Sequence, residues 1–277
     1  MNLNVYGNQA NEISVLLLPY NFIWEHYNAT PPWYSALAQG EALPILIKAY
    51  KLTGMEIYKK TAEGVINSFF VDVKEGGVTH KEGNAWWYEL YASKGSKNPK
   101  VLNGMLWTLL ALHEYYSLTK DLKAKLLFEN GLQALKKNLH LYDSEKFTYY
   151  DVLKTQANYD YHKVHIDLLN KLYSMTGEEI FKNYSQKWAA IPIKKPPHIE
   201  SPTIYLDEYY IPLVDYGERN GSFIGIQRNP LTVDHVARDY YEKYIEFEDQ
   251  FFKEAFLNNA KWLVNNAVQM NLSTKDK

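Results

Sequence analysis

The chain has no cysteine, no long apolar run and no excess of basic residues. The absence of cysteine among 277 residues excludes disulfides, thiolate nucleophiles and cysteine-ligated zinc. The formal net charge is -2 with acids and bases interspersed, which argues against a nucleic-acid binder because such proteins carry a basic bias. Apolar runs such as Val15 to Leu18 are far too short to cross a bilayer.

The first residues, Met1 to Ile13, are polar and show no basic segment followed by an apolar stretch. Secretory signals need both features, so the sequence predicts no such signal and a cytoplasmic location by default. What the chain has in excess is tyrosine, with 24 residues. Because a tyrosine pairs an apolar ring with a proton-transferring hydroxyl, the excess fits either structural filler or a sugar-binding cleft, and composition alone favours filler.

A weak internal repeat indicates the architecture. Four segments share a helix that ends in an aromatic residue, a short turn and a second helix, and their joints lie at 49–54, 115–120, 172–177 and 241–246. Two joints end in Gly54 and Gly177, where a helix C-terminus favours a left-handed residue. Apolar spacing then predicts helical hairpins at 34–70, 102–139, 161–191 and 230–268.

Hairpins of this size cannot bury their apolar faces alone, so the four must stack. We predict an all-α protein, an (α/α) toroid or barrel of about four hairpins, with residues 1–277 forming one domain. The last hairpin is expected to close the ring against residues 34–70, and an open superhelix is the alternative. The segments 71–91, 141–160 and 201–229 predict short β-hairpin loops on one face, where chemistry usually sits.

The first candidate cluster lies in the segment Trp86 to Tyr91. Alternation along an extended chain places Trp87, Glu89 and Tyr91 on one face. A glutamate between aromatic rings is a candidate general base, because burial raises its pKa. The structural alternative is an ordinary strand with an exposed acid.

Two further clusters follow along the chain. Tyr150 stands in a turn with Lys154 close behind, and the structural alternative is a β-turn with solvent-facing aromatics. Tyr161 begins the third hairpin together with His162 and His165, which are three residues apart and share a helical face. Without a third ligand, this pair favours capping, core packing or substrate hydrogen bonds, so we predict no metal site.

These segments together resemble the D-glucuronyl C5-epimerase family. The resemblance rests on Pro-Trp-Tyr-Ser-Ala-Leu-Ala-Gln-Gly-Glu-Ala at 32–42, Trp-Tyr-Glu-Leu-Tyr at 87–91, Val-Leu-Asn-Gly at 101–104, Leu-Tyr-Asp at 141–143, Tyr-Asp at 150–151, and Asp-Tyr-His at 160–162 with His-Ile at 165–166. Order and approximate spacing hold from about residue 32 to 188. Several linked motifs are far more specific than any single one.

The resemblance implies an (α/α) toroid that reversibly inverts C5 of a uronic acid within a glucuronate-containing polysaccharide, without a cofactor. The family uses tyrosines and a glutamate on opposite faces of the sugar. The matching tyrosines are Tyr91, Tyr150 and Tyr161, and Glu89 is the nearby acid. The expected substrate contacts are Trp33, Tyr34, Gln39, Trp87, Asn103, Lys154, His162, His165 and Arg228.

Three features depart from the family pattern. The family reads Trp-Tyr-Glu-Glu-Tyr where this chain has Leu90, so either Glu89 or a tyrosine must act as the base. The β-rich N-terminal domain of the animal enzymes has no counterpart here, so we expect a shorter cleft or one completed by a second subunit of a homodimer. Segments 229–233 and 256–263 resemble a hairpin that precedes the Pro-Trp-Tyr-Ser motif in the family, which predicts a circular permutation.

Two other functions stay open. A polysaccharide lyase on the same toroid would abstract the same C5 proton and then expel the C4 substituent, whereas a glycosidase would need two carboxylates across the cleft. A non-catalytic glycan-binding domain would explain Leu90. In each case we expect a uronate-containing glycan as the partner, with no role for nucleic acid or a membrane.

Overall fold

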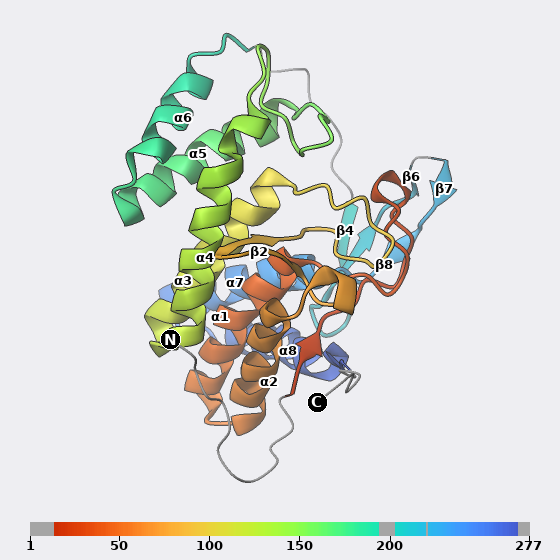
Figure 1. Cartoon of the computed structure of the whole chain (residues 1–277). Helices are drawn as coiled ribbons and strands as arrows, with labels where there is room; N and C mark the ends of the chain where they lie inside the picture. Colours follow the sequence, from red (N-terminus) through yellow and green to blue (C-terminus); the bar gives the residue numbers. More distant parts are fainter. Residues whose placement is uncertain (1–13, 194–202, 220, 271–277) are drawn as a thin grey trace, which may run out of the picture.

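The computed structural model describes residues 14–193, 203–219 and 221–270, and eight α-helices in this part form four hairpins (Figure 1). The pairs are α1 (Ala36–Thr53) with α2 (Glu56–Asn67), α3 (Leu102–Thr119) with α4 (Leu122–Asn138), α5 (Tyr159–Thr176) with α6 (Glu179–Ala189), and α7 (Pro230–Phe247) with α8 (Gln250–Asn266). The predicted all-α (α/α) fold of four hairpins is confirmed, with bounds within a few residues of those expected.

The helix ends follow from the local sequence. Ser35, Asn158 and Asn229 precede α1, α5 and α7, and each side chain accepts a hydrogen bond from a backbone N–H of the first turn. A cap of this kind stabilises a helix by about 1 kcal/mol. At the opposite ends of α1 and α5, Gly54 and Gly177 adopt the predicted left-handed conformation (φ 69° and 70°), which glycine tolerates because it has no Cβ.

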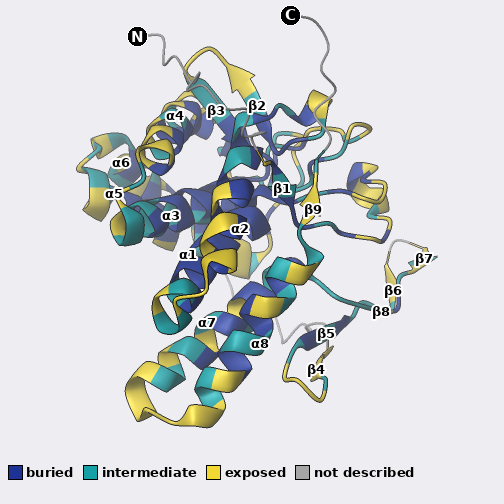
Figure 2. Cartoon of the chain, turned by 90° about the horizontal axis from the view of Figure 1, so that it is seen from below, coloured by how far each residue is buried: buried dark blue, intermediate teal, exposed yellow. Residues whose placement is uncertain are grey.

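The helices α1, α3, α5 and α7 form an inner row. Helix α1 packs against α3 on one side and α7 on the other, and α3 packs against α5, so the order in space is α5, α3, α1, α7. The buried residues gather along α1 and α3 (Figure 2). Gly40 of α1 lets α3 come close, since a Cβ added there would lie 3.4 Å from the Cβ of Ala111.

Ion pairs tie three of these inner helices together. Arg238 of α7 pairs with Glu41 of α1 (2.6 Å) and with Glu114 of α3 (2.9 Å). Glu114 also pairs with Lys48 of α1 (2.8 Å). Because the Glu41 side chain is only 6% exposed, water screens this network less than it screens isolated surface pairs. The network therefore fixes the relative positions of α1, α3 and α7.

Short strands lie between the hairpins and at the two ends of the described chain, and those within 71–91 and 203–227 agree with the prediction. They are β1 (Leu16–Leu17) paired with β9 (Val268–Gln269), β2 (Thr79–Glu82) with β3 (Ala85–Tyr88), β4 (Thr203–Leu206) with β5 (Pro212–Asp215), β5 with β8 (Ile226–Gln227), and β6 (Glu218–Arg219) with β7 (Ser222–Phe223). All five pairings are antiparallel. The segment 141–160 carries only an isolated bridge between Tyr149 and Gln156 among its described residues.

The fourth hairpin lies beside the first, although the two are far apart in the sequence. Helix α7 packs on α1, and α8 contacts both α1 and α2. The pairing of β1 with β9 also brings the two ends of the described chain side by side. Closure of the ring into a single domain and the circular permutation stay predictions.

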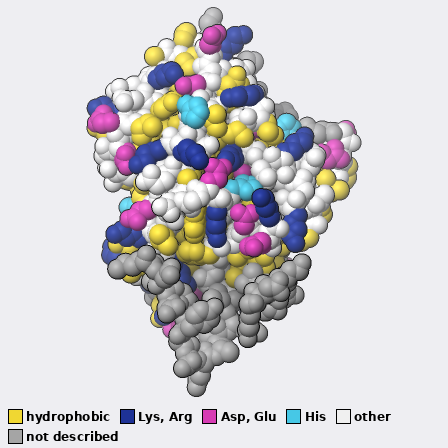
Figure 3. Space-filling view, viewed as in Figure 1, with side chains coloured by type: hydrophobic (Ala, Val, Ile, Leu, Met, Phe, Trp, Pro, Cys, Tyr) yellow, Lys and Arg dark blue, Asp and Glu magenta, His cyan; other side chains and the backbone are white. Residues whose placement is uncertain are grey.

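The surface is mixed in charge. Acidic and basic side chains alternate across the face shown in Figure 3, in keeping with the small net charge of -2. Among the described residues, no helix combines the length and apolar character that crossing a membrane would require.

Gln39 has a structural role instead of the expected contact with substrate. Its side chain is fully buried, and Oε1 accepts a hydrogen bond from the Leu18 N–H (2.8 Å) while Nε2 donates to the Leu16 carbonyl and to Ser68 Oγ (both 3.1 Å). These bonds use both amide protons of a fully buried side chain, so it has no donor free for a ligand. They hold the segment around β1 against α1.

We expect Gln39→Ala to lower the free energy of unfolding by about 2–4 kcal/mol, because the buried Leu18 N–H then lacks an acceptor. Urea denaturation followed by tryptophan fluorescence measures this change. The matched control is Gln133→Ala on the exposed side of α4, for which we expect a change within about 0.5 kcal/mol. Equal effects of the two substitutions would contradict the assignment.

Candidate active site

A cavity of about 230 Å³ opens where the N-terminal ends of the four inner helices meet. Each inner helix contributes a lining residue at or near its first turn: Ser35 of α1, Asn103 of α3, Tyr161 of α5 and Asn229 of α7. Backbone N–H groups at a helix N-terminus carry a positive partial charge. The cavity therefore suits a ligand with negative charge.

The three predicted tyrosines meet in this cavity. Tyr91, Tyr150 and Tyr161 all line it, and the Tyr150 and Tyr161 ring centroids are 4.8 Å apart. The third tyrosine, Tyr91, lies close enough to this pair for both Tyr150 and Tyr161 to shift its pKa. We call these three residues the tyrosine cluster.

Backbone hydrogen bonds position the members of the cluster. The Ala36 N–H at the start of α1 donates to the Glu89 carbonyl (2.8 Å), which places Tyr91 beside that helix end. The Leu102 N–H at the start of α3 donates to the Tyr150 carbonyl (3.0 Å). Tyr161 is the third residue of α5. The loops and helix ends therefore bring together residues that are distant in sequence.

Burial keeps the phenols of Tyr91 and Tyr150 protonated at neutral pH. Burial raises the pKa of Tyr91, the nearby Tyr161 raises it further, and the nearby Tyr150 hydroxyl lowers it. Burial also raises the pKa of Tyr150. The Tyr27 ring lies 4.7 Å from that of Tyr91. The Tyr27 hydroxyl donates a hydrogen bond to Asp151 Oδ2 (2.6 Å).

Two of the expected substrate contacts also line the cavity. Trp33 is buried, donates its indole N–H to the Phe22 carbonyl (2.7 Å) and stacks on Tyr20 with a centroid distance of 4.0 Å. The Oδ1 atom of Asn103 is buried and has no hydrogen-bond partner among the described residues. An unsatisfied buried polar atom in a cavity wall is costly unless a ligand or water meets it.

Other lining residues were missed by sequence reasoning. Tyr20, Phe22 and Trp24 come from the segment before α1, and Tyr216 and Asn229 come from the segment before α7. The alternating aromatics at 20, 22 and 24 were a usable signal, since alternation in an extended chain places side chains on one face. Tyr216 had no comparable signal.

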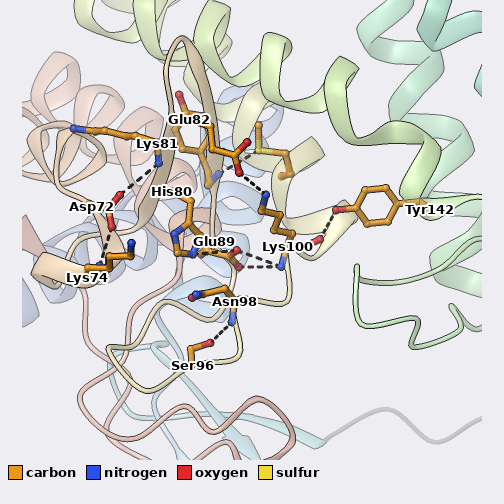
Figure 4. Close-up of polar contacts among 12 residues, drawn as sticks. Asp72, Lys74, His80, Lys81, Glu82, Glu89, Ser96, Asn98, Lys100 and Tyr142 are labelled. Atoms are coloured by element: carbon orange, nitrogen blue, oxygen red, sulfur yellow. Dashed lines mark hydrogen bonds and ion pairs between the residues drawn. The ribbon is translucent and has the colours of Figure 1, made fainter.

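The structure places Glu89 outside the cavity wall. Its carboxylate is fully buried behind the wall, accepts the Lys100 backbone N–H (3.2 and 3.3 Å) and lies 3.5 Å from His80 Nε2 (Figure 4). Burial raises the pKa of Glu89 to about 8 and lowers that of His80 below its usual value. Both groups are then neutral near pH 7. Their contact is therefore not a salt bridge, and the protonated Glu89 carboxyl does not act as a base.

The two histidines predicted to contact substrate lie in the core. Both are buried, His162 Nδ1 accepts the Thr148 N–H (3.0 Å), and His165 Nδ1 lies 2.7 Å from Thr148 Oγ1. Burial lowers the pKa of His165 to about 3, so this ring is neutral. The described residues contain no group of three or more potential metal ligands.

Four more expected contacts do not reach the cavity lining. Lys154 donates to the Leu141 carbonyl (2.6 Å), and Arg228 pairs with Asp207 and donates to the carbonyls of residues 211 and 212. Trp87 is a core residue stacked on Tyr142. Tyr34 lines a separate hollow of about 410 Å³. Sequence spacing alone did not show which side of each segment faces the cavity.

Comparisons with known proteins agree with the sequence motifs. A family model described as "D-glucuronyl C5-epimerase C-terminus" matches residues 11–190. An uncharacterized protein of Methanocaldococcus jannaschii is 34% identical over 180 residues, which cover 64% of this chain and 58% of that protein. D-glucuronyl C5-epimerase of Caenorhabditis elegans is 32% identical over 178 residues, which cover 57% of this chain and 28% of that protein. The chain thus spans less than two thirds of either relative.

Solved structures of low sequence identity resemble the fold weakly. Cellobiose 2-epimerase from Bacillus thermoamylovorans has a TM-score of 0.40 and 12% identity, covering 93% of this chain and 82% of that chain. A family 76 glycoside hydrolase from a bovine Bacteroides thetaiotaomicron strain has a TM-score of 0.40 and 14% identity, covering 93% of this chain and 53% of that chain. Scores of this size carry no functional argument.

The buried carboxyl of Glu89 predicts a pH dependence of stability. Its pKa rises from 4.5 to about 8 on folding, so the folded state keeps a proton that the unfolded chain loses above pH 4.5. The contribution is fully present below pH 4.5 and is lost as the pH rises toward 8, by at most about 1.4 kcal/mol per pH unit. Glu89→Gln should flatten this slope in urea denaturation between pH 5 and about 8.

The control for this experiment is Glu63→Gln, because Glu63 is exposed on α2. We expect this variant to keep the slope of the unsubstituted protein. If Glu89→Gln also leaves the slope unchanged, Glu89 does not hold a proton in the folded state.

Proposed function

Because the chain belongs to the D-glucuronyl C5-epimerase family, we propose that it is a carbohydrate epimerase that inverts C5 of a uronic acid within a glycan. The observation that carries the proposal is the cavity in which Tyr91, Tyr150 and Tyr161 meet at the N-terminal ends of the four inner helices. In this cavity the tyrosine hydroxyls can transfer protons, and the helix N-termini produce a positive electrostatic potential that favours an anion.

The helix ends would recognise the sugar carboxylate. A carboxylate at a helix N-terminus accepts hydrogen bonds from free N–H groups and is stabilised by the helix dipole. Asn103 in the first turn of α3 adds a polar side chain to the same wall. The aromatic rings of Trp24 and Trp33 supply apolar surface for a sugar ring. A glucuronate residue combines the two features that this lining complements.

The reaction requires the removal of a weakly acidic proton. The C5–H bond lies next to the carboxylate, and when it breaks the electron pair moves into that carboxylate as an enediolate. Donors aimed at the carboxylate oxygens stabilise this charge, which is the role we give the helix N-termini and Asn103. We assign the proton transfer on one face of the sugar to the tyrosine cluster, where the protonated phenols of Tyr91 and Tyr150 can return a proton to C5 as general acids.

One observation favours a second candidate function. Leu90 lines the cavity beside Tyr91, so the carboxylate expected at this position is replaced by an apolar side chain. A non-catalytic glycan-binding domain would use the same pocket without turnover. Such a domain binds uronate oligosaccharides and leaves the C5 hydrogen in place, which separates it from the epimerase.

Incubation with heparosan-like and other uronate polymers in deuterated water tests the proposal. We expect deuterium at C5 and inverted uronate residues, both detected by proton NMR. An unsaturated product that absorbs in the ultraviolet would instead identify a lyase. Binding of uronate oligosaccharides without exchange across the whole panel would rule out the epimerase and favour the binding domain.

Tyr91→Phe and Tyr161→Phe should each lower the rate of C5 exchange by at least about 100-fold, since general acid–base groups contribute at least that factor. The rings remain, so the packing around the cavity is kept. The matched control is Tyr209→Phe, an exposed tyrosine outside the cavity, which should exchange at the unsubstituted rate. Full activity of both cavity variants would remove the cluster from the mechanism.

A further inference from the structure

We propose that the hollow of about 410 Å³ beside Tyr34 is a second sugar subsite, which holds a neutral residue of the same glycan next to the reacting uronate. This inference rests on the proposed function, because it concerns the glycan whose uronate occupies the cavity. It gives Tyr34 a contact with the substrate, although Tyr34 does not line the cavity. The hollow binds the glycan and has no part in proton transfer.

The cavity is too small for more than one sugar residue. Its volume is about 230 Å³, whereas pockets for drug-sized molecules span about 300–1000 Å³. A uronate within a glycan has other sugar residues bonded to it, and these residues must lie outside the cavity. The hollow is larger than the cavity and can receive one of them.

A single bridge between two segments separates the hollow from the cavity. The Tyr34 N–H donates to the Ala92 carbonyl (2.9 Å), and the Ala92 N–H donates to the Tyr34 carbonyl (2.8 Å). Tyr34 and Ala92 line the hollow, while their chain neighbours Trp33 and Tyr91 line the cavity. Since successive side chains of an extended segment point to opposite faces, the hollow and the cavity lie on the two faces of this bridge.

The hollow lies at the same end of the inner helices as the cavity. Most of its lining comes from 30–34 before α1, 75–77 after α2, 92–94 after β3 and 269–270 after α8. Since α2 and α8 run antiparallel to α1 and α7 in their hairpins, their C-terminal ends lie beside the N-terminal ends of the inner helices. The exposed residues 30–32 lead directly to Trp33 of the cavity, so a glycan can pass from the cavity to the hollow over this rim.

The charges of the hollow suit a neutral sugar. Glu75 and Lys94 are the charged residues of its lining, one of each sign, and both are exposed. Neither takes part in an ion pair within the described part of the chain. A carboxylate accepts hydrogen bonds from sugar hydroxyls, and an ammonium group donates to hydroxyl oxygens. Because the two charges balance, the hollow provides no net attraction for a second uronate.

Apolar surface in the hollow complements the ring of a sugar. The half-buried Tyr34 and the exposed Pro31 and Pro32 supply rings against which the C–H groups of a sugar can pack. Gly76 leaves room for the stem of Lys94, since a Cβ added to Gly76 would lie 3.7 Å from Lys94 Cε. Ring surfaces and hydrogen-bonding groups thus occur together in the lining, as recognition of a sugar requires.

The test measures the affinity of Lys94→Ala and Glu75→Ala for a heparosan hexasaccharide, in which uronates alternate with a neutral amino sugar, by calorimetry. We expect each variant to bind about 3- to 10-fold more weakly, because each loses one hydrogen-bonding group for the sugar. Glu75→Ala is the decisive variant. If only the overall charge of the protein mattered, removing a negative charge would tighten binding of this anionic glycan, whereas the subsite predicts weaker binding.

Lys97→Ala is the matched control, because Lys97 is exposed in the same loop as Lys94 and does not line the hollow. We expect it to change the affinity less than about twofold. An affinity that Lys94→Ala lowers no more than Lys97→Ala, or that Glu75→Ala raises, would overturn the subsite alone. Binding of the hexasaccharide without C5 exchange would overturn the epimerase function, while the affinities of the variants would still decide on the subsite. An unsubstituted protein that does not bind the hexasaccharide would overturn both.

Discussion

The candidate site depends on helix α1 packing between α3 and α7. This packing sets the order α5, α3, α1, α7, and with it the meeting of four helix N-termini around one cavity. Gly40 permits the close approach of α1 and α3, and the ion pairs of Arg238 hold α7 against both. Since the cavity lining is anchored at these helix ends, a shift of α1 would separate the tyrosines and weaken the positive potential together.

Much of the fold followed from the sequence because it depends on local signals. The joints with Gly54 and Gly177 marked helix ends, and apolar spacing marked the helices that follow. The position of the fourth hairpin beside the first depends on contacts between residues far apart in the sequence. It was predicted from the order in which the matching segments occur in the family. The strands of 203–227 were expected only as loop structure, since strands of two to four residues carry almost no pattern.

The site was predicted in part. The cluster of Tyr91, Tyr150 and Tyr161, with Trp33 and Asn103, lies in the cavity as the motifs indicated. Eight other expected residues lie outside its lining: Tyr34, Gln39, Trp87, Glu89, Lys154, His162, His165 and Arg228. Gln39 and the two histidines satisfy buried backbone or hydroxyl groups, a role that a motif does not distinguish from ligand binding. Contacts across the chain decide between these roles, and the place of Tyr216 in the cavity lining follows from the structure alone.

The central claim is that the helix N-termini and the tyrosines converge on one uronate residue. A crystal structure of the protein with a heparosan oligosaccharide tests it most directly. We predict a uronate carboxylate within hydrogen-bond distance of the first-turn N–H groups or Asn103, with C5 beside the tyrosine cluster. An oligosaccharide bound elsewhere on the surface, or one whose carboxylate points away from the helix ends, would contradict the account.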